Sequence, residues 1–405
     1  MNCTLSDKLT TDFPQDEYDS RVKRARELME AENFDAIMVT GDLSAAMNYR
    51  YFSGHLPRDY QSNFSRPHVM ILPREGKPAI IAYVLNERDA KITSWVRNIR
   101  SYTQPFTFQP VYDAIKELGL EGSTIGAELG VDQRLMMPVL EFQRLQENLP
   151  SAKFVDASEL LWEMRTIKSP REVECIKRAD EMNGQSLDRL YQTIHKGMTE
   201  IEVAKKLVTL MIEEGSWRPP HDQIIMNSGP DWRISFAAPK DKVITTGDIL
   251  FIDSGCVVKG YWGEFNRMGV VGKPTERQLK NHEIIRTIVQ KTIADAVRPG
   301  VKMSDLTKYL VKMYKSYGLD YEVYKSYLEY PFMHLSHGIG LNSSEPPFVR
   351  IDNEKPLKPG MTLSMEAYLK DGEVYGTEED VLITDDGYDI LSEKFLDNKL
   401  YLISV

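Results

Sequence analysis

Acidic residues inside two apolar, strand-like stretches constrain the fold of this chain more than any other feature. Residues 248–272 are typical of two strands joined by a short turn. If the two-residue loop begins at Val258, Asp253 lies directly opposite Glu264; if it begins at Lys259, the two are diagonal neighbours on one face. Either register predicts a carboxylate pair, which repels unless one group is protonated or a cation lies between them. The alternative is an exposed hairpin with solvated acids.

A second hairpin is predicted over residues 363–384, with its turn at Asp371-Gly372. That turn places Glu366 opposite Thr377, and it places Glu379 two residues further along on the same face. Glu366 lies in an apolar strand, where an unpaired buried charge is costly. We therefore expect a second convergent pair of carboxylates; an acidic surface turn is the alternative.

His337, in the segment FMHLSHGIGLNSSEPPFV, adds an imidazole to these four carboxylates. Such a donor set suits one or two ions of Mn, Fe, Co or Zn, and it contains too much nitrogen for a typical calcium site. A metal centre of this kind activates a water and polarises a carbonyl. A structural role is the alternative for His337 taken alone.

The 405 residues exceed one ordinary core, so two domains are expected. Strands alternate with helices over the first part of the chain, which predicts an α/β domain over residues 1–163. Ser169-Pro170 is a helix start signal, and long amphipathic helices followed by strands predict an α+β domain over residues 164–405.

Composition excludes several classes of protein. The net charge of -10 argues against a nucleic-acid-binding protein or one that binds anionic membranes, and 42% hydrophobic residues are typical of soluble globular proteins. Three scattered cysteines fit a reducing compartment. No apolar run is long enough to span a membrane and no signal peptide is evident, so we expect a cytoplasmic protein.

Five segments, in order, resemble the creatinase/prolidase/aminopeptidase P group, which has the pita-bread fold. They are LWEMRTIKSPREVECIKRAD, SGPDWRISFAAPKDKVITTGDILFIDSG, the loop that contains His337, LKPGMTLSMEAYL and EEDVLIT. The resemblance implies a creatinase-like N-terminal domain, a pita-bread catalytic domain and a divalent metal. The implied metal ligands are Asp253, Glu264, His337, Glu366 and Glu379, with Glu264 in place of an aspartate.

The sequence departs from the peptidases of this group at three positions. The peptidases have a substrate-binding histidine as the ninth residue of SGPNxxxPH, and the matching residue here is Phe236. The catalytic histidine of creatinase would fall on the same position. The second histidine of the peptidase motif HGxGLxxHExP is Ser344 here. An arginine two residues before the last glutamate is Thr377 by this alignment. Loss of groups that handle protons, each contributing roughly 10²–10⁴ in rate, argues against a general Xaa-Pro peptidase.

Further residues are candidates for contact with substrate, each with a structural or surface role as the alternative. Arginine suits bidentate recognition of a carboxylate, and the aromatic and imidazole groups lie in segments that resemble the site region. The predicted catalytic residues are Glu264, His334 and Glu345. The predicted substrate-binding residues are Phe236, Trp232, Arg233, His221 and Arg50.

The main hypothesis is a metal-dependent hydrolase that acts on a small C–N bonded or short peptide-like substrate. A metal-assisted lyase is the first alternative. It resembles the pita-bread dimethylsulfoniopropionate lyase, although the base aspartate of that enzyme would fall near Ser343. A non-catalytic metabolite-binding protein is the second. The resemblance also implies a homodimer in which the N-terminal domain of one chain lies near the active site of the other.

Overall fold

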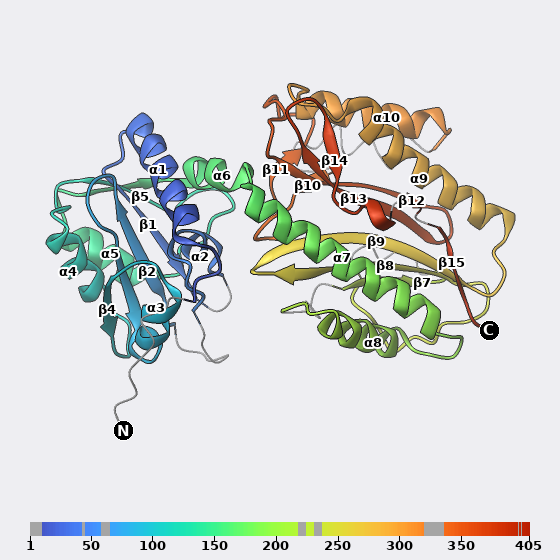
Figure 1. Ribbon diagram of the computed structural model, residues 1–405, viewed down its shortest axis with the longest axis horizontal. Helices are drawn as coiled ribbons and strands as arrows, with labels where there is room; N and C mark the ends of the chain where they lie inside the picture. The colour runs from blue at the N-terminus through green and yellow to red at the C-terminus, as the bar shows by residue number, and fades with distance from the viewer. Residues whose placement is uncertain are drawn as a thin grey trace. The chain divides into compact units, whose positions relative to one another are not determined.

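The structure is a computed structural model in which residues 10–42, 45–57, 65–217, 224–230, 237–319, 336–395, 397 and 399–405 are described. The chain divides into two compact units, Met1–Arg165 and Thr166–Val405 (Figure 1). The division falls two residues beyond the boundary predicted after residue 163. None of the helices in the described ranges is long and apolar enough to cross a membrane.

The described part of the first unit forms one mixed six-stranded sheet with the order β4-β3-β2-β1-β5-β6. Its central strands are buried on both faces, because helices cover the sheet, and they are therefore mostly apolar. The strands are β1 (Ala36–Gly41), β2 (His68–Pro73), β3 (Ala79–Tyr83), β4 (Asn98–Tyr102), β5 (Thr124–Ala127) and β6 (Lys153–Asp156). The α-helices are α1 (Gln15–Glu32), α2 (Met47–Ser53), α3 (Glu87–Thr93), α4 (Gln109–Glu117), α5 (Val139–Asn148) and α6 (Ser158–Thr166).

The second unit contains two sheets, with the orders β15-β9-β8-β7 and β11-β10-β12-β13-β14 in its described residues. The strands are β7 (Ile225–Ser228), β8 (Ile249–Val258), β9 (Tyr261–Val271), β10 (Ser336–Gly338), β11 (Glu345–Val349), β12 (Thr362–Lys370), β13 (Val374–Ile383), β14 (Tyr388–Ile390) and β15 (Tyr401–Ile403). The α-helices are α7 (Pro170–Thr193), α8 (Glu200–Glu213), α9 (Glu276–Ala296) and α10 (Met303–Ser316). The expected α/β unit followed by an α+β unit is confirmed.

Helices cover the outer faces of these sheets and leave their inner faces toward each other (Figure 1). Helix α7 packs on β8 and β9, whereas α9 packs on β12 and β13. The predicted helix start is confirmed, because Ser169 caps α7 by accepting a hydrogen bond from the Glu172 backbone N–H, with Pro170 in the first turn. Such a cap contributes about 1 kcal/mol.

The β8–β9 hairpin has the second of the two predicted registers. Val258 pairs with Tyr261, so the loop is Lys259-Gly260, and both loop residues have positive φ angles of 50° and 89°. Two-residue hairpin loops with both φ angles positive match the twist of the flanking strands. Gly255 is consequently the partner of Glu264, which is a diagonal neighbour of Asp253 on the same face.

The β12–β13 register was predicted wrongly by one residue. Lys370 pairs with Val374, so the loop is three residues long, and Glu366 lies opposite Glu378 rather than opposite Thr377. Because side chains alternate between faces along a strand, this shift moves Glu379 to the other face of β13.

Glu373, the third loop residue, explains the longer turn. Its buried carboxylate accepts hydrogen bonds from the Ile249 backbone N–H, from the Gln278 amide and from the Tyr375 hydroxyl. Arg277 on α9 also pairs with it at 3.3 Å. These contacts hold Glu373 in the loop, and none of them is visible in the local sequence of the hairpin.

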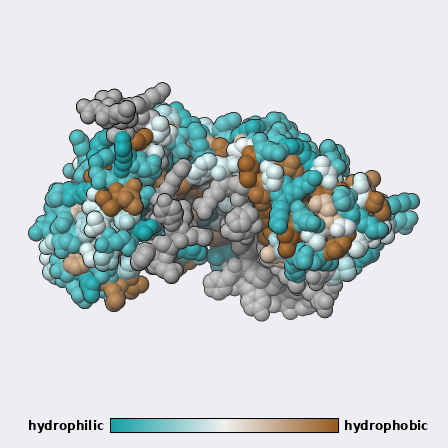
Figure 2. Space-filling model, turned by 90° about the horizontal axis from the view of Figure 1, so that it is seen from below, coloured by the Kyte–Doolittle hydropathy of each residue, from teal (hydrophilic) through white to brown (hydrophobic). Residues whose placement is uncertain are grey.

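The surface carries apolar side chains in small groups among hydrophilic residues, as the face in Figure 2 shows. Exposed examples are Leu85, Val131, Val139 and Leu140. Such scatter is ordinary, since more than half of the accessible surface of a typical folded protein is apolar.

Candidate metal centre

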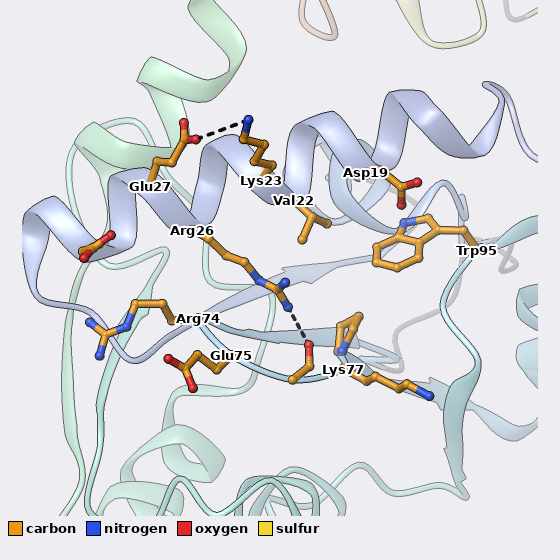
Figure 3. Close-up of a pocket in the computed structure, with 12 residues that line it drawn as sticks. Asp19, Val22, Lys23, Arg26, Glu27, Arg74, Glu75, Lys77 and Trp95 are labelled. Atoms are coloured by element: carbon orange, nitrogen blue, oxygen red, sulfur yellow. Dashed lines mark hydrogen bonds and ion pairs between the residues drawn. The ribbon is translucent and has the colours of Figure 1, made fainter.

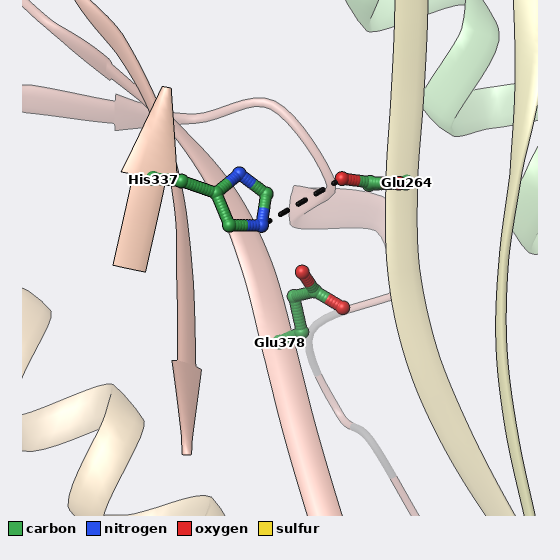
Figure 4. Close-up of side chains that lie close together, drawn as sticks. All are labelled: Glu264, His337 and Glu378. Carbon is green, nitrogen blue, oxygen red and sulfur yellow. Dashed lines mark ion pairs between the residues drawn. The ribbon is translucent and has the colours of Figure 1, made fainter. Parts of the chain in front are cut away.

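Three side chains from three different strands converge between the two sheets of the second unit. Glu264 of β9, His337 of β10 and Glu378 of β13 each offer a ligand atom, and these atoms all lie within 4.8 Å of one another (Figure 4). His337 Nε2 lies 3.9 Å from Glu264 Oε1. Ligands that share one ion are about 3–4 Å apart, because each lies roughly 2.0–2.2 Å from it.

Asp253 and Glu366 extend this group on the same side. Glu366 Oε1 lies 4.0 Å from His337 Nε2, and the charge of Glu366 contributes to the raised pKa of Asp253. The side chains of Glu264 and Glu366 are 14% and 12% exposed, so the cluster is nearly buried and still reached by solvent. The structure therefore places four of the five ligands expected from the sequence in one cluster.

The electrostatics of the four carboxylates call for a cation. Burial raises the pKa of Asp253 and of Glu366 to about 7, and it raises the pKa values of Glu264 and Glu378 well above the usual range. Among the described residues, no lysine or arginine forms an ion pair with any of the four. Four buried acids without a counter-charge are unstable as anions, and a divalent ion removes that penalty.

The orientation of His337 supports the same conclusion. Its Nδ1 lies 3.1 Å from the Gly338 carbonyl oxygen, which can only accept, so Nδ1 carries the proton. Burial lowers the pKa of His337 and favours the neutral ring. Nε2 then presents a lone pair toward carboxylate oxygens, as it does in metal sites where the other ring nitrogen donates to a backbone carbonyl. The residues fit a divalent cation.

Glu378 is held from two sides. Its Oε1 accepts from the Ser364 hydroxyl at 2.6 Å and its Oε2 accepts from the Asn266 amide at 3.0 Å. Hydrogen bonds of this kind fix the orientation of a ligating carboxylate.

Glu379, expected from the sequence to be a ligand, faces the other side of β13. Its Oε2 pairs with Arg267 at 3.1 Å and accepts from the Ser392 hydroxyl, and both members of the ion pair are at most 2% exposed. The structure thus contradicts the expected placement of Glu379, and Glu378 takes its place. The register error is the physical reason.

Comparison with known proteins agrees with this geometry. The model of metallopeptidase family M24 matches residues 174–385, and that of the creatinase/prolidase N-terminal domain matches residues 21–167. The chain belongs to metallopeptidase family M24. The predicted creatinase-like domain, the pita-bread domain and the metallohydrolase class are confirmed.

Relatives of this M24 protein include two Xaa-Pro dipeptidases. That of Pyrococcus horikoshii is 26% identical over 371 residues, covering 91% of this chain and 95% of the relative. That of Pyrococcus furiosus is 29% identical over 282 residues, covering 69% and 75%. Among solved structures, the prolidase from Pyrococcus horikoshii aligns with a TM-score of 0.76 at 25% identity, covering 92% of this chain and 98% of that one.

The peptidases of this group have an arginine two residues before the last glutamate ligand. Because that ligand is Glu378 rather than Glu379, the matching position in this chain also moves by one residue. Counting back from Glu378 gives Gly376 rather than Thr377. Ser344, which stands where the peptidase loop has its second histidine, is exposed. Neither Gly376 nor Ser344 offers a cationic or imidazole group to this M24 site.

Glu345, predicted to be catalytic, lies in a buried ion pair. Its Oε1 is 3.1 Å from Lys168 Nζ, both side chains are 1% exposed, and its Oε2 accepts from the Asn342 backbone N–H. With both oxygens engaged, Glu345 ties Lys168 to the loop that follows His337, and its catalytic role stays a prediction.

The geometry of this cluster does not test the remaining predicted residues. Arg50 belongs to the first unit, where its Nε and Nη2 donate to Asp12 at 3.0 and 2.7 Å. The others fall outside the described residues, and they are His221, Trp232, Arg233, Phe236 and His334.

A cavity of about 600 Å³ lies in the first unit, between α1 and the β2–β3 turn (Figure 3). Acidic and basic side chains alternate along its walls, and Arg26 crosses it to donate to the Gly76 carbonyl at 2.5 Å. It has no imidazole and no group of converging carboxylates, so the chemistry of an M24 enzyme belongs to the second unit.

Proposed function

We propose that this protein is a divalent-metal-dependent hydrolase that cleaves a C–N bond beside a carbonyl in a small, peptide-like molecule. The observation that carries the proposal is the convergence of Glu264, His337 and Glu378, with Asp253 and Glu366 beside them. Relatives named Xaa-Pro dipeptidases support a substrate of this size and chemistry.

The residues of the chain would share the work as follows. Asp253, Glu264, His337, Glu366 and Glu378 would hold the metal. When bound, a divalent ion supplies Lewis-acid polarisation of the substrate carbonyl and acidifies a water. The Glu264 carboxylate, which is partly exposed, is suited to take a proton from an attacking water and to return it to the leaving amine.

We further propose that the substrate is not a general Xaa-Pro peptide. Phe236, Ser344 and Gly376 replace groups that the resembled peptidases use around the reacting carbonyl. A peptidase that lacks several such groups loses much of its rate, since each contributes roughly 10²–10⁴.

The test is a substrate panel with the protein purified without chelator. The panel contains Xaa-Pro dipeptides, other dipeptides, N-acyl amino acids and cyclic amides, and it is run in ¹⁸O-labelled water with Mn²⁺, Co²⁺ or Zn²⁺. We expect ¹⁸O in the carboxyl product of a non-proline substrate, and turnover that His337→Ala abolishes. Efficient hydrolysis of several Xaa-Pro dipeptides would overturn the proposed specificity, and absence of bound metal would overturn the metal centre.

Elimination is the second candidate. It is favoured by the absence of any cationic or imidazole group at Ser344 and Gly376 to stabilise a tetrahedral adduct, because proton abstraction followed by loss of a leaving group forms no such adduct. Release of an unsaturated product without ¹⁸O incorporation would identify it.

A homodimer in a reducing compartment is part of the proposal. The resemblance to the creatinase group supports the dimer, and three cysteines scattered over the chain support the compartment. Light scattering on the purified protein should give twice the 46.5 kDa chain mass; a monomer would remove the dimer from the proposal without touching the metal centre.

A further inference from the structure

Tyr368 touches the metal centre from a position that sequence reasoning did not identify. It lies two residues after Glu366 on β12, so both side chains point to the same face. Its hydroxyl donates to Glu366 Oε2 at 2.7 Å. Tyr368 also partly offsets the rise in the pKa of Asp253, so the phenol lies near a second of the four carboxylates.

The ring of Tyr368 has little freedom to leave this position. Its cross-strand partner is Gly376, and a Cβ added there would lie 3.0 Å from two ring carbons of Tyr368 and 2.6 Å from Phe251. Phe251 packs edge-to-face on the ring with centroids 5.8 Å apart, and the Tyr368 backbone N–H donates to the Tyr314 hydroxyl. A glycine on one strand thus provides the space that the tyrosine on the next strand fills.

The two carboxylate oxygens of Glu366 have different neighbours. Oε2 is occupied by the phenol, whereas Oε1 faces His337 Nε2 at 4.0 Å. Hydrogen bonds that orient a ligating carboxylate typically contribute 10–100-fold to metal affinity.

We propose that Tyr368 is a positioning residue of the metal centre. Its phenol holds Glu366 in the orientation that receives the ion, and Gly376 is the position that allows the ring to lie there. The inference rests on the proposed metal centre and deepens it, since it assigns the group that aligns one of the proposed ligands.

The chain offers a matched control for the test. Tyr375, on β13, donates its hydroxyl to Glu373 Oε2 at the same distance of 2.7 Å, and Glu373 belongs to the hairpin turn. Tyr368→Phe and Tyr375→Phe therefore each remove one hydrogen bond from a tyrosine hydroxyl to a carboxylate. Only Tyr368→Phe removes a bond to a proposed ligand.

The experiment titrates the full-length apo proteins with Co²⁺ and measures the dissociation constant and the visible absorption of the bound ion. We expect Tyr368→Phe to bind Co²⁺ about tenfold more weakly or worse, with an altered spectrum, and Tyr375→Phe to match the wild type in both. Equal affinity and equal spectrum for Tyr368→Phe and the wild type would overturn the inference, and so would equal losses in the two variants.

Gly376→Ala provides a second route to the same answer should Tyr368→Phe not fold. The added methyl displaces the ring, so Co²⁺ affinity should fall while the Tyr368 hydroxyl is still present in the chain; unchanged affinity would count against the inference. Failure of the wild type to bind Co²⁺ refutes the proposed function itself and is distinguishable from failure of a variant alone.

Discussion

Substituting each of two adjacent glutamates in turn distinguishes the role of the metal centre from that of the ion pair on the opposite face of the same strand. Glu378 belongs to the carboxylate cluster, and Glu379 pairs with buried Arg267. Glu378→Gln and Glu379→Gln change the same functional group one residue apart, so they serve as controls for each other. We expect opposite effects on metal binding and on the stability of the metal-free protein.

The magnitudes follow from the two environments. Loss of a charged ligand at Glu378 should weaken metal binding at least about 100-fold, or about 2.8 kcal/mol. Loss of a residue that only orients a ligand typically weakens binding by roughly 10–100-fold. Burial holds the pKa of Glu378 above its usual range. Its contribution to stability is therefore present at low pH and lost as pH rises through the folded-state pKa, so metal-free Glu378→Gln should be more stable than the wild type at pH 8.

Glu379→Gln removes the charged partner of an arginine that is almost fully buried. Breaking such a pair from one side costs roughly 3–5 kcal/mol, because the remaining charge is left uncompensated. The variant should unfold at lower urea concentration, yet its folded fraction should bind metal within a few-fold of the wild type.

The assay is urea unfolding at pH 8 with EDTA and again with Co²⁺, beside a direct Co²⁺ titration of each variant. Glu378→Gln should lose the stabilisation that Co²⁺ gives the wild type, and Glu379→Gln should retain it. A variant pair with these results reversed would refute the register and return the ligand role to Glu379.

Three further predictions use the same measurements. Co²⁺ affinity should fall by about tenfold or more per pH unit below pH 7, since Asp253 and Glu366, each with a pKa of about 7, must lose protons to bind; a flat profile between pH 5 and 7 would contradict the ligand set. Lys168→Met should destabilise the protein by roughly 3–5 kcal/mol in urea unfolding because it strands Glu345, and loss of under 1 kcal/mol would contradict a buried pair. Asp180→Asn should stabilise the protein at pH 8 and not at pH 4, because burial holds the pKa of Asp180 well above its usual value and ionising it opposes folding.

The sequence could predict much of this fold because local patterns agree with the final contacts. Ser169 and Pro170 begin α7 as the capping signal indicates. The β8–β9 loop is short, and its two residues adopt the positive φ angles that such a loop requires. Asp253 and Glu264 could therefore be brought together without coordinates.

The second hairpin shows where local patterns are insufficient. Its register depends on Glu373, which is held by Ile249 and Gln278 from parts of the chain about a hundred residues away. Alternation of apolar and polar residues could not indicate the register either, because both faces of β13 are buried and residues 374–381 are all buried. Tyr368 was missed for a related reason: its ring lies in the space that Gly376 leaves, and that pairing follows from the register of the hairpin.

Anomalous diffraction from crystals grown with Co²⁺ tests the metal centre most directly. We expect a peak about 2.0–2.3 Å from His337 Nε2 and from carboxylate oxygens of Glu264 and Glu378, and Tyr368 in contact with Glu366. A peak bound by Glu379, or no peak among these residues at saturating Co²⁺, would contradict the metal centre described above.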